Sequence, residues 1–501
     1  MISGDGAVAP PEGTLTLRHL IGGDWVTSAS GATFERRSPA NGQPVSVASQ
    51  GGAEDVRAAI GAARAAFDDG CWSELAGADR ARVLSRVADL IDAQRARLAL
   101  YETMESGKPI SQAEAEIEGA AQIWRYAATL AWNIRGQSQN ALGADMLGMV
   151  LKEPIGVVSI ITPWNFPLLI VSQKLPFALA AGCTAVVKPS EMTSATTVLL
   201  GELLIEAGLP AGVVNIVLGY GDPVGALMTT DPEVDMVSFT GSTGVGKAIV
   251  AATSGTLKKV SLELGGKNPQ VVFSDADLDQ AADAIAFGVY FNAGECCNSG
   301  SRIIVHEEVA EALTDKVVAL SRKVPFGDPL NPATKVGAII SPEHQAKIDG
   351  YVKDAEAGGA SVLLGGGPIA VEGLTGHFYQ PTVVSGVTAN MPIAHEEVFG
   401  PVLSVLTFRT FEEAIALANG AAYGLSAGVW SENVHTCLAF ARKVRAGTVW
   451  TNTWMDGYPE LPFGGVKESG LGRELGPNGI DEFLETKTVQ MRIGKTRPMW
   501  V

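Results

Sequence analysis

The spacing of hydrophobic positions changes along the chain, and each change predicts a different kind of element. Across residues 53–67 and 80–100 the apolar side chains recur at helical spacing; in the second segment Val83, Val87 and Ile91 form one stripe, opposite Arg and Asp side chains. We therefore expect two amphipathic helices early in the chain. Residues 137–152 lack such a stripe and end in an apolar run, which predicts a strand that leaves the main body.

From residue 157 onward, short β-branched runs alternate with helical stretches. The runs cover residues 157–161, 185–187, 213–217, 236–239 and 260–262. A helix is expected over residues 193–208, between the second and third runs. Such alternation is typical of parallel strands joined by crossover helices. A second α/β series follows, with a strand at 269–273 and a helix for which Asp275 or Asp277 supplies the cap.

The composition of the chain narrows its class. With 501 residues and 46% hydrophobic side chains, it can bury large cores and form about two to four domains. Its formal net charge of −17 repels nucleic acid and anionic lipid headgroups. The five cysteines show neither a disulfide framework nor the spacing of a metal site, so we expect a reducing, cytoplasmic location and no bound metal.

Neither a signal peptide nor a membrane span is expected. Residues 1–13 contain no basic residue and no continuous apolar run, and we expect them to form a loose tail. The most apolar stretch, residues 155–181, is interrupted by Pro163, Pro167 and Pro176 and cannot cross a bilayer as one uninterrupted helix.

Three segments are candidates for binding a nucleotide. In residues 219–225 the third glycine comes one residue later than a dinucleotide-binding motif requires and Pro223 interrupts the turn, so we expect a loop. In residues 239–247 a strand meets a glycine-rich turn and a helix start, where free N–H groups can face a pyrophosphate. An ordinary strand-to-helix turn explains that segment equally well. Lys188 and Glu191 stand at another strand end, where a solvated turn is the better interpretation when they are taken alone.

Other segments carry candidate catalytic side chains, each of which is ambiguous when it is considered alone. Most lone cysteines are buried and unreactive, but Cys296 and Cys297 follow a glycine-flanked loop at the end of a helix, where a substrate can reach a thiol. Glu263 ends an apolar strand, where a carboxylate is costly unless it is solvated or used as a base. Asn165 stands between bulky rings and two prolines and can donate to an oxyanion.

Taken together and in this order, seven segments make the chain resemble the aldehyde dehydrogenase superfamily. They are residues 163–167, 188–191, 239–246, 263–267, 294–297, 397–401 and 462–465. The resemblance runs from about Leu20 to the C-terminus. Residues 148–162, 194–219 and 239–269 look most like bacterial sorbosone-type dehydrogenases, and betaine-aldehyde-type enzymes are a near relation.

The resemblance implies oxidation of an aldehyde to a carboxylic acid. By position, Cys297 matches the nucleophile, and Asn165 with the Cys297 N–H would hold the oxyanion. Hydride would leave for the nicotinamide, and Glu263 would activate the water that hydrolyses the thioester. Lys174 belongs to this catalytic set by its position, with a structural role as the alternative. Relatives that transfer the acyl group to coenzyme A usually lack the glutamate, so its presence favours hydrolysis.

The cofactor implied by the resemblance is NAD, with NADP also possible. Glu191 and Lys188 match residues that bind the adenosine ribose, and a carboxylate there would repel a 2′-phosphate. Glu397 and Phe399 match residues that hold the nicotinamide ribose. The full set of expected cofactor-binding residues is Ile161, Thr162, Pro163, Trp164, Lys188, Ser190, Glu191, Gly221, Phe239, Gly241, Ser242, Gly246, Leu264, Glu397 and Phe399.

Two residues depart from the common pattern of the family. Glu295 stands where glutamine is usual, and a carboxylate so close would raise the pKa of the Cys297 thiol unless it is paired or turned away. Gly244 stands where many relatives have glutamate, which leaves open how the following helix is capped.

The matched segments also predict the substrate pocket. Its expected lining is Phe166, Ile170, Gln173, Cys296, Asn298, Trp454, Met455, Tyr458 and Phe463. Gln173 and Asn298 could bond hydroxyl groups, which slightly favours a polar or sugar-derived aldehyde of the sorbosone type. Trp454 and Tyr458 could instead enclose a quaternary ammonium, with Glu460 adding charge, which favours a betaine aldehyde or an amino aldehyde.

The resemblance implies a Rossmann-type cofactor domain at residues 1–134 and 154–262, a catalytic α/β domain at 263–468, and a β arm at 135–153 and 484–501. Residues 469–483 would lead back to the cofactor domain. The arm implies pairing of strands between subunits, as a homodimer or a homotetramer. The competing class is a non-catalytic binding or structural protein of the same family, against which the three catalytic side chains argue; cofactor-free esterase activity of the thiolate would be a side reaction.

Overall fold

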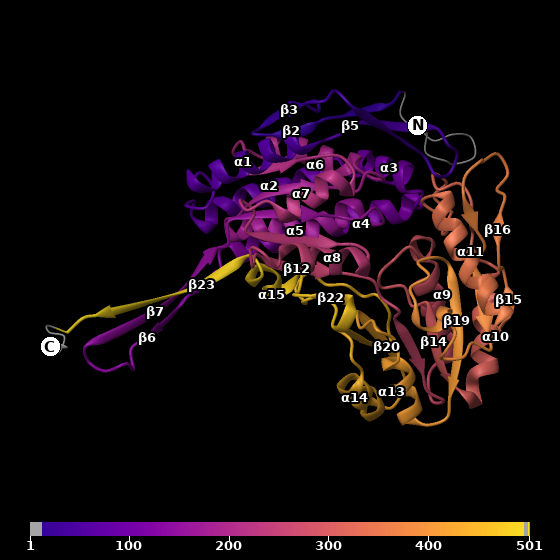
Figure 1. The fold of residues 1–501 in the computed structure, drawn as a ribbon. Coiled ribbons are helices and arrows are strands. Elements are labelled where there is room, and N and C mark those ends of the chain that lie inside the picture. Colours follow the sequence, from indigo (N-terminus) through magenta and orange to yellow (C-terminus); the bar gives the residue numbers. More distant parts are fainter. Residues whose placement is uncertain (1–12, 495–498, 500) are drawn as a thin grey trace.

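The computed structural model describes residues 13–494, 499 and 501 (Figure 1). Its first large sheet has eight strands in the order β22–β12–β11–β8–β9–β10–β2–β3. The five central strands are parallel and correspond to the predicted runs: β8 (Val157–Ile161), β9 (Thr184–Lys188), β10 (Val214–Ile216), β11 (Met236–Thr240) and β12 (Lys259–Glu263). The antiparallel edges are β22 (Gly470–Leu471) on one side and β2 (His19–Ile21) with β3 (Asp24–Val26) on the other.

Helices cover both faces of this sheet, because successive side chains of each strand point to opposite faces. In β8, Val158 and Ile160 join the core under α2 (Gly77–Ala93), α4 (Ile110–Ala131), α5 (Pro167–Ala181) and α6 (Ala195–Glu206). Val157 and Ile161 join the opposite core, under α1 (Ala53–Asp68), α7 (Ala226–Thr230) and α8 (Thr243–Thr253).

One expectation about this region is wrong. The single helix expected over residues 80–100 is two helices, α2 and α3 (Arg95–Ser106), because the backbone leaves the helical conformation at Gln94 (φ −102°, ψ 11°). In the expected loop at residues 219–225, Asp222 has a non-helical backbone (φ −114°, ψ 126°), and the segment leads directly into α7. Val224 of this segment is fully buried in the core under α1 and α7.

The second large sheet has seven strands in the order β15–β18–β19–β14–β13–β20–β21. Only β15 (Ser361–Leu364) is antiparallel; the others are β13 (Pro269–Val272), β14 (Arg302–His306), β18 (Thr382–Ser385), β19 (Val402–Phe408), β20 (Ser426–Trp430) and β21 (Thr448–Thr451). One face packs against α9 (Leu278–Tyr290), α10 (Ala310–Ser321) and α11 (Pro342–Ala357), and the other against α13 (Phe411–Asn419) and α14 (Val434–Lys443). Of the two predicted caps, Asp277 begins α9, whereas the Asp275 carboxylate accepts from the Ser431 hydroxyl at 2.8 Å.

A narrow antiparallel sheet extends away from the two large sheets (Figure 1). It consists of β6 (Gln137–Gln139), β7 (Met146–Pro154) and β23 (Leu484–Arg492), in the order β23–β7–β6. Pairing of β7 with β23 runs from Pro154 opposite Leu484 to Met146 opposite Arg492. Of the expected arm, residues 495–498 and 500 lie outside the described residues, as do residues 1–12 of the expected tail.

Smaller elements complete the described chain. β1 (Leu15–Leu17), β4 (Thr33–Arg37) and β5 (Pro44–Ser49) form a three-stranded sheet. Within the described ranges no helix is long and apolar enough to cross a membrane, and all five cysteines are unbridged. The exact domain limits and the cytoplasmic location stay predictions.

Candidate active site

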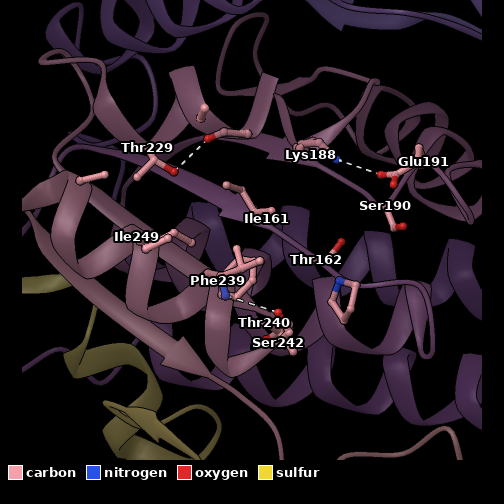
Figure 2. Close-up of a pocket in the computed structure, with 18 of the residues that line it drawn as sticks. Ile161, Thr162, Lys188, Ser190, Glu191, Thr229, Phe239, Thr240, Ser242 and Ile249 are labelled. Atoms are coloured by element: carbon pink, nitrogen blue, oxygen red, sulfur yellow. Dashed lines mark hydrogen bonds and ion pairs between the residues drawn. The ribbon is translucent and has the colours of Figure 1, made fainter. Parts of the chain in front are cut away.

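The first candidate cavity lies where the order of the parallel strands reverses. From β8 the chain continues to β9 and β10 on one side and then returns to β11 and β12 on the other, so β8 and β11 lie side by side. In sheets of this kind, ligands bind in the crevice outside the carboxyl ends of such a strand pair. Here the crevice holds a cavity of about 560 Å³ beside Ile161 of β8 and Thr240 of β11 (Figure 2).

Most of the predicted cofactor-binding residues line this cavity. They are Ile161, Thr162, Pro163, Trp164, Lys188, Ser190, Glu191, Gly221, Phe239, Gly241 and Ser242. Figure 2 shows Lys188, Ser190 and Glu191 grouped together, away from Thr240 and Ser242. The fold therefore gathers residues from several loops at one edge of the sheet.

The groups around the cavity fit a dinucleotide. Ser242 caps α8 by accepting a first-turn N–H at 3.4 Å, and the free N–H groups of a helix start favour phosphate. Gly241 is required in this turn, because a Cβ there would lie 2.4 Å from the ring of Phe239. In the other group, Lys188 Nζ lies 3.6 Å from the Glu191 carboxylate, which is available to accept from a ribose hydroxyl.

Four predicted cofactor residues lie outside the wall of this cavity. Gly246 packs on Leu264, which lines the second cavity described below; a Cβ on Gly246 would lie 2.6 Å from Leu264 Cδ2. Glu397 accepts a backbone N–H at 2.9 Å from the segment that follows β12, and burial raises its pKa to about 7. The ring of Phe399 meets Trp164 edge-on, with 5.4 Å between centroids.

The second cavity, of about 580 Å³, contains both predicted reacting groups, Cys297 and Glu263. Residues of both large sheets line it. Thr240 lines both cavities, so the two spaces adjoin at the end of β11. The predicted pocket residues that line it are Phe166, Ile170, Gln173, Cys296, Asn298, Met455, Tyr458 and Phe463.

The predicted position of Trp454 is wrong. Its ring is buried against Gly288, Gly300 and Gly428, whose lack of side chains leaves the space that it fills. Trp450, whose ring centroid lies 4.9 Å from that of Trp454, lines the cavity instead. Glu460 also lies outside the cavity wall.

The charged side chains that line the second cavity are all acidic. They are Glu116, Glu263, Asp456 and Glu474, and no Lys, Arg or His is among the described lining residues. Two lysines pair with these acids without lining the cavity: Lys108 with Glu116 and Lys174 with Glu474. The cavity therefore presents carboxylate oxygens rather than cations to a ligand.

The nucleophile loop begins with a left-handed turn. Asn292, Ala293 and Gly294 have φ angles of 51°, 54° and 74°, and the Glu295 N–H closes the turn on the Asn292 carbonyl at 2.9 Å. Two of these residues are not glycine, so the turn is strained and depends on its surroundings. A Cβ on Gly294 would lie 2.1 Å from the Gly400 carbonyl oxygen, so this loop packs directly on the segment that follows Phe399.

The same turn orients the predicted oxyanion donor. Asn165 Nδ2 donates to the Glu295 carbonyl at 3.0 Å, which fixes the plane of the amide and leaves its second N–H available. Asn292 Nδ2 donates to the carbonyls of Asn165 and Glu295, both at 3.1 Å. Asn292 was not singled out from the sequence; its position within the glycine-flanked loop before the cysteines was the available signal.

Glu295 is turned away from the thiol. Its Oε1 accepts the Ile340 N–H at 3.0 Å and lies 3.8 Å from His344 Nε2. The pKa of Cys297 is raised above its usual value chiefly by the neighbouring Cys296 thiol and by burial, while the Asn298 N–H lowers it. The concern that Glu295 would suppress the nucleophile is thus answered by its orientation.

Glu263 is buried with neither oxygen hydrogen-bonded to any described residue. Burial and the neighbouring Glu474 raise its pKa well above the usual range, and Lys174 opposes that shift. Lys174 is fully buried in its ion pair with Glu474 and does not line the cavity. Its position favours the structural and electrostatic alternative over direct contact with substrate.

Residues 263–268 connect the two large sheets and bind three parts of the site together. Glu263 ends β12, the N–H of Gly266 bonds to Glu397, and Asn268 Nδ2 donates to the Cys297 carbonyl at 2.7 Å. The chain returns beside this crossing: the Ser469 carbonyl accepts from the residue 264 N–H at 2.9 Å. Asn268 was also not singled out from the sequence, because its partner is a backbone carbonyl on another loop.

The first cavity has groups that fit a dinucleotide, and it adjoins a second cavity that holds a cysteine, a carboxylate with free oxygens and an oriented amide. This is the arrangement of a nucleotide-dependent oxidoreductase with a covalent thiol intermediate. Among the described residues, no group of His, Cys, Asp and Glu side chains could hold a metal ion.

The chain belongs to the aldehyde dehydrogenase family, whose sequence pattern matches residues 25–489. It is 42% identical over 471 residues to the betaine aldehyde dehydrogenase of Bacillus subtilis (strain 168), covering 94% of this chain and 96% of that relative. It is 41% identical over 491 residues to aminoaldehyde dehydrogenase 2 of Zea mays, covering 96% of each.

Solved structures agree with this assignment. An NAD-dependent aldehyde dehydrogenase from Sinorhizobium meliloti superposes with a TM-score of 0.96 at 51% identity, covering 99% of both chains. A betaine aldehyde dehydrogenase from Staphylococcus aureus, in complex with NAD+, superposes with a TM-score of 0.95 at 39% identity, covering 97% of both chains. The predicted family and fold class are thereby confirmed.

Proposed function

We propose that this protein oxidises a cationic aldehyde, of the betaine aldehyde or amino aldehyde type, to its carboxylic acid with NAD. The single observation that carries the choice of substrate is the charge of the second cavity, whose charged lining residues are all acidic. Glu116 and Glu474 are paired with buried lysines, so Glu263 and the exposed Asp456 are the carboxylates that attract a ligand of the opposite charge. The similarity to a betaine aldehyde dehydrogenase of Bacillus subtilis and an aminoaldehyde dehydrogenase of Zea mays supports the same choice over the sorbosone-type aldehyde predicted from the sequence.

The first chemical step uses the nucleophile loop. The Cys297 thiolate attacks the aldehyde carbon, and the oxygen becomes an oxyanion held by the free N–H of Asn165 and by the Cys297 backbone N–H. Because Asn292 and the Glu295 carbonyl fix Asn165, this donor needs no reorganisation when the charge appears. When the oxyanion collapses, hydride leaves the same carbon, which becomes the carbonyl of a thioester on Cys297; NAD, when bound, would accept that hydride.

Hydrolysis of the resulting thioester falls to Glu263. Its two oxygens lack partners in the described chain, so they are available to hold a water and accept its proton. The raised pKa makes the carboxylate a stronger base than an exposed glutamate. The water attacks the thioester carbon, the carbon–sulfur bond breaks, and the acid leaves Cys297 free. This role supports hydrolysis rather than acyl transfer to coenzyme A.

The cofactor is NAD rather than NADP because of Glu191. Its carboxylate faces the first cavity beside Lys188, where it can accept from a free 2′-hydroxyl and repel a 2′-phosphate. We expect NADP to support a slower reaction. Comparison of kcat/KM for the two cofactors with one aldehyde measures this preference.

An aldehyde panel tests the proposal. Betaine aldehyde, a primary amino aldehyde, a sorbosone-like aldehyde and a neutral aliphatic aldehyde of matched length are each assayed for NADH formation. We expect kcat/KM to be highest for one of the two cations. Equal values for all four, or a preference for the sugar-derived aldehyde, would contradict the proposed substrate class.

The assigned nucleophile has its own test. Cys297→Ala removes the thiol, so aldehyde-dependent NADH formation should be abolished while NAD still binds by calorimetry. Cys437→Ala is the matched control, because that buried thiol lies in the core under α14 and outside both cavities. Substantial turnover by Cys297→Ala would refute the role of Cys297.

We further propose that the arm formed by β6, β7 and β23 pairs strands between subunits, giving a homodimer or a homotetramer. Both outer strands of this narrow sheet, β6 and β23, have an edge without a partner strand among the described residues. Light scattering of the intact protein should give a mass of two or four chains. A monomeric mass would refute this assembly.

A further inference from the structure

One face of α11 holds the segment that contains Glu397 and Phe399. His344, Lys347 and Tyr351 lie on that face, since residues three, four and seven positions apart in a helix point the same way. Their partners are, in order, the Phe399 carbonyl at 2.7 Å, the Glu397 carbonyl at 3.4 Å and Glu396 Oε2 at 2.8 Å. Ile348, between them, packs on Gly400. The segment is thus held along its whole length by one helix.

The hydrogen bond from His344 supports a strained residue. Phe399 has a φ of 59°, a left-handed conformation that is strained for a residue with a side chain and persists only where the surroundings enforce it. A carbonyl oxygen can only accept, so the His344 Nε2 carries the hydrogen of this bond. Burial lowers the pKa of His344 to about 4, so the ring is neutral near pH 7.

The same imidazole contacts the wall of the first cavity. The centroid of the His344 ring lies 5.6 Å from that of Trp164 and 5.8 Å from that of Phe399. Trp164 lines the cavity and directly precedes Asn165. The same Nε2 that donates to the Phe399 carbonyl lies 3.8 Å from the Glu295 carboxyl of the nucleophile loop. Three separate segments of the site therefore meet at one side chain.

We propose that His344 is a positioning residue for the cofactor: by donating to the Phe399 carbonyl, it holds the 397–399 segment and the Trp164 ring in the arrangement that binds NAD. This inference rests on the proposed use of NAD. It concerns a residue that lines neither cavity and has no part in the chemical steps described above.

The test measures NAD binding directly, without aldehyde, by isothermal titration calorimetry. His344→Leu and His344→Phe cannot donate to the carbonyl, and we expect each to weaken the Kd for NAD about tenfold. His344→Gln keeps a donor at similar reach and should restore the Kd to within about twofold of the wild-type value. Gln345→Leu is the matched control: Gln345 Nε2 donates to the Phe378 carbonyl at 2.8 Å from the same helix, so it loses a comparable bond elsewhere.

The outcomes separate this inference from the proposed function. Wild-type protein that binds no NAD would overturn both. If the wild-type protein binds NAD and the Leu and Phe variants bind it equally well, the role of His344 alone is overturned. It is also overturned if His344→Gln is as weak as His344→Leu, or if Gln345→Leu is weakened to the same degree. Thermal unfolding of each variant sets the titration temperature below the lowest Tm.

Discussion

Two buried clusters of charged side chains, equal in composition, lie beside the second cavity. They differ in how many of their carboxylate oxygens have hydrogen-bond partners. Each contains one lysine and two glutamates: Lys108 with Glu102 and Glu116, and Lys174 with Glu474 and Glu263. Burial raises the pKa of Glu116 and of Glu263 alike. By composition and burial, the two clusters are alike.

Their hydrogen bonds separate them. In the first cluster Lys108 pairs with both glutamates and lies 4.5 Å from the centroid of the Phe166 ring, while Glu102 accepts the N–H of Leu168 at 3.3 Å. That cluster fixes the start of α5, next to Asn165. In the second cluster Lys174 is occupied by Glu474, and Glu263 keeps both oxygens free. Glu116 keeps one oxygen without a partner and Glu263 keeps both, so the number of free oxygens, and not burial or pKa alone, assigns Glu263 to chemistry.

The largest expected effect comes from removing the free carboxylate. Glu263→Gln should lower steady-state turnover by about 10²–10⁴-fold, because the thioester loses its general base. One equivalent of NADH per active site should still form in a stopped-flow burst. Turnover at the wild-type rate would show that Glu263 is not the general base, and the proposed difference between the two clusters would then be wrong.

The matching change in the first cluster should act on stability. Lys108→Met leaves two carboxylates in the interior without their cation, which we expect to cost about 3–5 kcal/mol in the free energy of unfolding, measured with urea. The residual activity of the folded fraction should not show an accumulated acyl-enzyme. Accumulation would mean that this cluster also serves hydrolysis.

A smaller effect should distinguish Lys174 from Lys108 in the pH dependence of thioester hydrolysis. The Lys174 cation lowers the pKa of Glu263, so Lys174→Met should raise that pKa further. The base is active when ionised, so the pH profile of thioester hydrolysis should move to higher pH in this variant. The folded fraction of Lys108→Met is the control, and its profile should stay in place. If the pH profile of Lys174→Met matches that of the wild type, the charge of Lys174 does not affect the pKa of Glu263.

The smallest effect concerns the thiol. The Cys296 thiol raises the pKa of Cys297, so Cys296→Ala should lower that pKa and increase the thiolate fraction at a given pH. The pH dependence of alkylation by iodoacetamide, with Cys297→Ala as the blank, should shift to lower pH. A shift in the opposite direction would contradict the assigned cause.

The parallel strands and the site motifs could be predicted because each is specified by residues within one short segment of the chain. A β-branched run such as residues 236–239 and the turn after it specify a strand end and a helix start, and the structure has β11 and α8 there, with Ser242 as the cap that the sequence left open. Seven such segments in order were enough for the family. The orientation of Glu295 was not predictable, because it is decided by the Ile340 N–H, distant in sequence.

The failure at Trp454 has a physical cause that lies outside its own segment. Trp454 and Trp450 are four residues apart, and their chemistry is the same; the space left by three distant glycines decides which ring faces the cavity. Packing of this kind depends on side chains that a sequence pattern does not place together. The break in the expected helix at 80–100 is different, because both halves pack into the same core and only the backbone at Gln94 departs from the helix.

The crossing at residues 263–268 also places the base and the thiol on one short stretch of chain. It runs beside the returning chain, where the Ser469 hydroxyl donates to the Gly265 carbonyl at 2.7 Å. Glu263 is the first residue of the crossing, and Asn268 near its end holds the Cys297 carbonyl. Tyr458 and Leu461, exposed side chains of the cavity lining, come from another loop. A displacement of that loop, as an aldehyde enters or an acid leaves, would therefore not change the spacing of the base and the thiol.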